Sequence, residues 1–150
     1  MSEQKGKILF ICTGNYYRSR FAEIVFNKLA EEQSLGMTAI SRGFTPQSPN
    51  NPGPISPYAI QELKKRGIVL NGETRFPMLL EETHLQEADL TIAMKGPEHR
   101  PMMAQRFPRW ADRITYWHIH DIQDAHPYEA MALLENQVIE LVEQLANQAD

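Results

Sequence analysis

The sequence contains a single cysteine, Cys12, among its 150 residues. One thiol cannot form an intramolecular disulfide, which excludes a disulfide-stapled scaffold and gives no reason to place the chain in an oxidising compartment. The sequence also lacks any apolar run near the roughly 20 residues that are needed to cross a bilayer. We therefore expect a cytoplasmic protein that does not associate with membranes.

Basic residues are scarce as well, with 15 lysines and arginines against 19 aspartates and glutamates and a net charge of -4. This balance excludes a general nucleic-acid binder, which needs a basic face to neutralise phosphates. There is no internal repeat and no glycine pattern of a nucleotide-binding loop, so we expect no organic cofactor. The length and the 42% hydrophobic content predict one globular domain over residues 1–150, acting as a monomer or weak homo-oligomer.

Two apolar periodicities alternate along the chain. The alternation predicts strands at 7–12, 37–41, 90–94 and 114–117, and helices at 18–33, 57–66, 78–87, 98–106 and 128–149. Strands that alternate with helices predict an α/β fold, a parallel sheet with helices on both faces. Ligands of such sheets bind beyond the carboxyl ends of the strands, where Cys12 lies.

Half of the ten prolines fall between residues 46 and 57, in a stretch that predicts a long surface loop within the domain. Loops of this length are more often the wall of a functional site than an idle connection. We therefore expect this proline-rich loop to border a binding site.

Cys12 and Arg18 flank a five-residue turn between the first strand and the first helix. A helix N-terminus and a nearby cation both favour the thiolate, which is the nucleophilic form of cysteine. The planar guanidinium of Arg18 can bind two phosphoryl oxygens at once. The spacing predicts a cysteine nucleophile at the floor of a phosphate site. A small buried cysteine with no function is the alternative, but it would leave the arginine unexplained.

The residues within the turn support the same chemistry. Gly14 and Asn15 are the residue types that most easily adopt positive φ, so the N–H groups of residues 13–18 can turn inward as an anion-binding nest. The hydroxyl of Ser19 can donate to the sulfur of Cys12. The pattern therefore predicts phosphate-ester chemistry.

The run Cys12-Thr13-Gly14-Asn15-Tyr16-Tyr17-Arg18-Ser19 resembles the signature of the low-molecular-weight protein tyrosine phosphatases. The resemblance extends through Ser41-Arg42-Gly43, Ala88-Asp89-Leu90 and Met94 with His99. It implies a four-stranded parallel sheet of order 2-1-3-4 and metal-free hydrolysis of phosphotyrosine in proteins or of a small aryl phosphate.

The same resemblance implies roles for single residues. Cys12 would become phosphorylated, residues 13–18 would hold the phosphoryl oxygens together with the Arg18 side chain, and Ser41 would support Asn15. Tyr16, Tyr17 and Tyr128 would rim the mouth of the site or pack as ordinary half-buried residues.

The family places an aspartate that acts as general acid in the loop before the last helix. Asp124 is the expected match, because it lies nearer the helix start; Asp121 is the competing candidate, and either could instead cap the helix. The proline that normally follows this aspartate is replaced by Ala125.

Three other features depart from the family. Tyr17 occupies the place of a second cysteine, Arg20 replaces a proline and can point to solvent, and Gln47 with Ser48 stand where an aromatic residue commonly lines the cleft. The altered Asp124-Ala125 context keeps a phosphate-binding regulatory module without turnover as an alternative. An arsenate reductase is a further alternative, although it needs additional cysteines. His118 and His120 match metal templates weakly, so no metal site is expected.

Overall fold

The computed structural model describes residues 6–70 and 74–148, so the remaining residues of the predicted 1–150 domain, and the last residue of the predicted final helix, lie outside it. Four parallel strands form one sheet in the order β2-β1-β3-β4, which confirms the predicted fold. The strands are β1 (Gly6–Cys12), β2 (Met37–Gly43), β3 (Leu90–Ala93) and β4 (Thr115–Tyr116).

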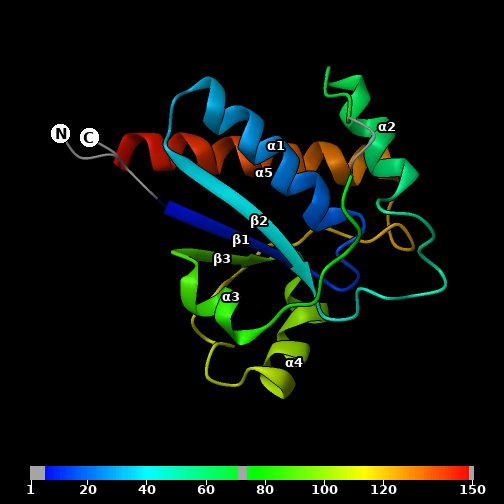
Figure 1. The fold of residues 1–150 in the computed structure, drawn as a ribbon, viewed down its shortest axis with the longest axis vertical. Helices are drawn as coiled ribbons and strands as arrows, with labels where there is room; N and C mark the ends of the chain where they lie inside the picture. Colours follow the sequence, from blue (N-terminus) through cyan, green and yellow to red (C-terminus); the bar gives the residue numbers. More distant parts are fainter. Residues whose placement is uncertain (1–5, 71–73, 149–150) are drawn as a thin grey trace.

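Helices cover both faces of the sheet (Figure 1). One face carries α1 (Arg18–Glu32), α2 (Pro57–Lys65) and α5 (Pro127–Gln148), and the other carries α3 (Glu82–Glu87) and α4 (Gly96–Arg106). None of the helices in these two described stretches is long and apolar enough to cross a membrane.

The central strand β1 supplies side chains to both cores. Ile8 and Phe10 pack with α1 and α5, whereas Leu9 and Ile11 face the opposite cluster beside α4. All four are fully buried, as expected of a central parallel strand that is covered on both faces. Cys12 continues the first of these two rows and ends the strand at the edge of the core.

Most element boundaries agree with the sequence predictions to within two residues, but the helix predicted over 78–87 begins only at Glu82. Before it, Gly43 donates its N–H to the carbonyl of Met78 (2.9 Å), and the N–H of Leu80 donates to the carbonyl of Gly43 (2.8 Å). These bonds pair the segment with the end of edge strand β2, whose backbone groups would otherwise be open. Strand pairing therefore overrides the apolar helical pattern here.

Gly43 lies against the loop that follows β1. A Cβ atom at this position would be 2.7 Å from the amide nitrogen of Asn15 and 2.9 Å from the carbonyl oxygen of Thr13. Both are backbone atoms, which cannot rotate away. The close approach of β2 to the loop therefore requires a glycine.

We predict that Gly43→Ala displaces this loop and lowers the free energy of unfolding by about 1–3 kcal/mol, as overpacking does. Gly96→Ala is the control, because its Cβ would meet Tyr116 at an ordinary 3.5 Å. Urea denaturation of both variants measures the effect. Equal stability of the two variants would contradict the predicted clash.

Candidate active site

The loop between β1 and α1 places the thiol of Cys12 beside the first turn of a helix. Asn15 adopts a left-handed conformation with φ 51°, whereas Gly14 does not have positive φ. Gly14 instead packs closely against a side chain, because a Cβ there would lie 2.8 Å from the side-chain Nδ2 of Asn51. The expected turn is present, and of the two residues expected to have positive φ only Asn15 does.

Backbone N–H groups of the loop are left without protein partners. Within the described chain, no amide from residue 13 to residue 18 donates a hydrogen bond to a protein acceptor. Buried amides are nearly always paired. A run of unpaired amides beside a helix N-terminus is the arrangement that binds anions.

Asn15 braces the loop through its buried side-chain amide. Its Nδ2 donates to the hydroxyls of Ser19 and Ser41 (2.9 Å each). Its Oδ1 accepts from Nη1 of Arg75 and from the N–H of Met78 (3.0 Å each). Four hydrogen bonds thus hold the residue whose backbone carries the unusual φ.

Ser19 connects this brace to the nucleophile. Its Oγ lies 3.0 Å from the Cys12 Sγ, and both atoms are buried. Because the hydroxyl oxygen already accepts from Asn15, its proton is free to point at the sulfur. A hydroxyl that donates to sulfur stabilises the thiolate.

Arg20 is buried rather than directed to solvent, with 3% of its surface exposed. Its guanidinium donates to the carbonyls of Pro54 and Arg75 (2.8 Å each). Burial, reinforced by the charge of Arg75, lowers the pKa of Arg20 to about 10. Arg20 therefore ties the proline-rich loop and the segment before α3 to the first turn of α1.

The guanidinium of Arg18 is held by α4. Its Nη1 and Nη2 donate to the two carboxylate oxygens of Glu98 (3.0 and 2.8 Å), and Nη1 also donates to the carbonyl of Ile119 (3.0 Å). Arg18 is 1% exposed, and its Nε has no acceptor in the described part of the chain. Asp121 forms an ion pair with the same guanidinium, with 3.5 Å between Oδ2 of Asp121 and Nη2 of Arg18.

Glu98 was not among the residues that the sequence indicated. Its Oε2 also accepts from the hydroxyl of Thr13 (2.5 Å) and lies 3.2 Å from Nε2 of His99. Burial alone would raise the pKa of Glu98, but the hydrogen bonds from His99, Arg18 and Thr13 hold it well below its usual range. Glu98 is therefore a permanent anion beside the phosphate loop.

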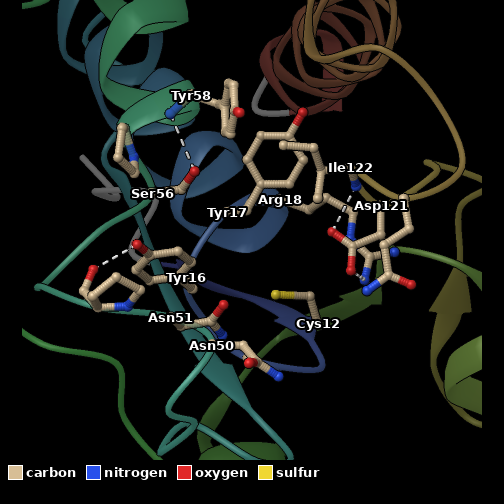
Figure 2. A pocket seen from close by; sticks show the side chains of 14 residues that line it. Cys12, Tyr16, Tyr17, Arg18, Asn50, Asn51, Ser56, Tyr58, Asp121 and Ile122 are labelled. Atoms are coloured by element: carbon tan, nitrogen blue, oxygen red, sulfur yellow. Dashed lines mark hydrogen bonds and ion pairs between the residues drawn. The ribbon is translucent and has the colours of Figure 1, made fainter.

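A cavity of about 340 Å³ opens above Cys12 (Figure 2). The proline-rich loop forms one wall, as expected, and the segment before α5 forms another. The lining residues are Cys12, Gly14, Tyr16, Tyr17, Arg18, Asn50, Asn51, Pro52, Ser56, Pro57, Tyr58, Asp121, Ile122 and Gln123. Gln47 and Ser48 line a different surface hollow.

The two candidate acids occupy different surroundings. Asp121 lines the cavity beside Arg18, and Figure 2 draws it close to Arg18. Asp124 is outside the lining, its side chain is 52% exposed, and it pairs with Nζ of Lys95 at 3.3 Å. Asp121 therefore lies in the cavity lining and Asp124 outside it, and the choice of Asp124 as the acid stays a prediction.

The three tyrosines also differ. Tyr16 donates its hydroxyl to the carbonyl of Pro52 (2.6 Å) and forms part of the cavity wall. Tyr17 lines the cavity too, but 94% of its surface is buried and its ring joins the core beside α1 and α5. Tyr128 is 62% exposed, lies under Nζ of Lys65 and is not part of the cavity lining.

Residues 6–70 and 74–148 contain no cluster of three or more histidine, cysteine, aspartate or glutamate side chains arranged to hold a metal ion. The rings of His118 and His120 pack edge to face, with 4.9 Å between their centroids. The two histidines therefore make an aromatic contact at this position.

Comparisons with known proteins agree with this geometry. The family model described as low molecular weight phosphotyrosine protein phosphatase matches residues 7–149. A protein-arginine-phosphatase of Bacillus subtilis (strain 168) is 36% identical over 107 residues, which are 71% of this chain and 67% of that protein.

Two solved structures have similar folds. The crystal structure of a low molecular weight protein tyrosine phosphatase from T. tengcongensis is 27% identical, with a TM-score of 0.73 over 95% of this chain and 99% of that one. A cysteine-to-serine mutant of the YwlE arginine phosphatase, with a phosphorylated active-site serine, is 28% identical, with a TM-score of 0.72 over 95% and 94%.

We predict that Arg20→Met lowers the free energy of unfolding by about 1–3 kcal/mol, because it leaves part-buried carbonyls of two segments without their arginine donor. Arg113→Met is the matched control, since Arg113 is exposed and makes no ion pair or side-chain hydrogen bond in the described chain. Urea denaturation at neutral pH compares the variants. The assignment fails if both lose the same small amount of stability.

Proposed function

Because the chain belongs to the low molecular weight phosphotyrosine protein phosphatase family, whose members are cysteine-based phosphatases, we propose that it hydrolyses phosphomonoesters on proteins through a phosphorylated Cys12. One observation carries this proposal: the sulfur of Cys12 lies beside a run of unpaired amides and a buried guanidinium. The amides and Arg18 supply the hydrogen-bond donors that stabilise a phosphoryl group in the transition state of its transfer.

The donors of Arg18 account for two phosphoryl oxygens. A guanidinium carries one N–H on Nε and two on each Nη. Glu98 and the carbonyl of Ile119 use both donors of Nη1, and Glu98 uses one donor of Nη2. The Nε donor and the second Nη2 donor lie along one edge of the guanidinium. This pair fits two oxygens of a phosphoryl group.

The proposed reaction has two steps. The thiolate of Cys12 attacks phosphorus in line, an S–P bond forms as the P–O bond breaks, and Asp121 gives its proton to the leaving oxygen. In the second step Asp121 takes a proton from water, the water oxygen bonds to phosphorus, and the S–P bond breaks. Inorganic phosphate and the free thiolate are the products.

Phosphotyrosine is the proposed substrate. Above Cys12 the cavity is lined by the ring of Tyr16, the ring of Tyr58 and the side chain of Ile122, a surface on which an aromatic ring can stack. Phosphoarginine is the second candidate; in this phosphoramidate a P–N bond would break in place of the P–O bond, and the leaving nitrogen would take the proton. It is favoured by the similarity to the Bacillus protein-arginine-phosphatase and by the carboxylate of Asp121, which could bind a guanidinium leaving group.

We further propose that the protein acts in the cytoplasm as a monomer or weak homo-oligomer. The nucleophile works as a free thiol, and the cytosol keeps thiols reduced. Tyr17 replaces the second cysteine of the family, so protection of Cys12 by a loop disulfide is excluded. One chain supplies all the residues that line the cavity.

A substrate panel tests the proposed function. We expect turnover of p-nitrophenyl phosphate and of a phosphotyrosyl peptide, with a higher kcat/KM for that peptide than for the matched phosphoarginyl peptide. Cys12→Ser should lower kcat by about 10⁴-fold or more. A higher kcat/KM for the phosphoarginyl peptide would make phosphoarginine the substrate instead of phosphotyrosine. No turnover of any of the three would contradict phosphatase activity itself.

The identity of the acid has a separate test. We predict that Asp121→Asn lowers kcat by about 10²–10⁴-fold for phenyl phosphate, whose leaving group needs a proton, and by much less for p-nitrophenyl phosphate. Asp124→Asn is the control and should change both rates less than about 3-fold. A larger loss in the Asp124 variant would restore the prediction made from the sequence.

A further inference from the structure

Glu98 binds one particular edge of the Arg18 guanidinium, and this determines which edge is left for phosphate. We propose that Glu98 is a positioning residue: it holds the end of the Arg18 guanidinium so that the Nε/Nη2 edge faces the phosphoryl group. This inference rests on the proposed phosphatase function. Glu98 lies on α4, outside the run from Cys12 to Ser19, so this role gives α4 a function in substrate binding.

The guanidinium has two edges that can each bind two oxygens. The end edge consists of Nη1 and Nη2, and both donate to Glu98 at 3.0 and 2.8 Å. The side edge consists of Nε and Nη2, and its Nε is buried and has no acceptor in the described chain. A buried donor without a partner is costly. An incoming phosphoryl oxygen would satisfy it.

Glu98 is itself held rigidly enough to orient another side chain. Nδ1 of His99 accepts from the N–H of Lys95 (3.0 Å), so the proton of the neutral ring is on Nε2. That Nε2 points at Thr13 and Glu98, at 3.1 and 3.2 Å. Because burial lowers the pKa of His99, the ring stays neutral and keeps this orientation.

Thr13 completes the support, since its hydroxyl donates to Oε2 of Glu98 at 2.5 Å. Thr13 follows the nucleophile directly in the chain. The carboxylate therefore ties the beginning of the phosphate loop to the arginine at its end. Any shift of Glu98 would move both ends of the loop relative to each other.

An opposite role has to be distinguished from this one. A carboxylate on a phosphate-binding arginine could act as a competitor that phosphate must displace. The geometry favours positioning, because Glu98 occupies the end edge and leaves the Nε donor of the side edge unpaired. Asp121 Oδ2 lies 3.5 Å from Nη2 on that edge. The two roles predict opposite effects: removing a competitor tightens phosphate binding, whereas removing a positioning residue weakens it.

The test compares Glu98→Gln, Glu98→Asp and a control. Glutamine keeps the shape of the side chain but replaces one acceptor oxygen and the charge, and aspartate keeps the charge. Glu135→Gln is the control, because Glu135 on α5 makes an ion pair of 2.8 Å with Arg66 at the end of α2. The Glu135 side chain is 32% exposed, against 25% for Glu98. Assays use p-nitrophenyl phosphate, with inorganic phosphate as a competitive inhibitor.

We expect Glu98→Gln to lower kcat/KM by about 10- to 100-fold, the scale of a misplaced binding group, and to raise the inhibition constant of phosphate by a similar factor. Glu98→Asp should recover part of both losses. The control should change neither, even if its melting temperature falls. An unchanged or tighter inhibition constant in Glu98→Gln would overturn the positioning role.

A second measurement separates this inference from the proposed function. Inorganic phosphate should protect Cys12 from alkylation by iodoacetamide in the native protein, and Glu98→Gln should need a roughly 10-fold or more higher phosphate concentration. If the native protein is protected but does not hydrolyse phosphoesters, only the proposed function fails. If both proteins are protected equally, the positioning role fails whatever the turnover.

Discussion

The left-handed conformation of Asn15 is the constraint on which the site depends. It lets the backbone leave β1, pass over Cys12 and enter α1 with the amides of residues 13–18 free of protein acceptors. An L residue with a side chain adopts this conformation at some cost. Four hydrogen bonds to the Asn15 side chain offset that cost, and Gly43 leaves room for it on β2.

Charge is arranged around the same loop. Arg18 and Arg20 are both nearly inaccessible to solvent, but they are compensated in different ways. Arg18 is paired with Glu98, and Arg20 is surrounded by carbonyl oxygens. Each cation is therefore fixed in place by the protein. A preorganised cation costs little reorganisation when a dianion binds, which makes the arrangement suitable for phosphoryl transfer.

Local sequence patterns predicted the parts of this molecule that local interactions determine. The apolar run 8–11, the turn at Asn15 and the start of α1 at Arg18 all followed from neighbouring residues. Features that depend on distant segments could not be read in this way. Glu98 reaches Arg18 across 80 residues of sequence, and the segment from Met78 to Leu80 pairs with β2 instead of forming a helix. Which of Asp121 and Asp124 lines the cavity depends on the path of a loop, which residue types do not specify.

Trapping the covalent intermediate tests the account most directly. The Asp121→Asn protein would be mixed with p-nitrophenyl phosphate, quenched in acid within the first turnover, digested and analysed by mass spectrometry. We predict the added mass of one phosphoryl group on the peptide that contains Cys12, and none on that peptide in the Cys12→Ala, Asp121→Asn double variant, which has no nucleophile at position 12. Release of p-nitrophenol with no adduct on Cys12, or with phosphate on another residue, would contradict the account.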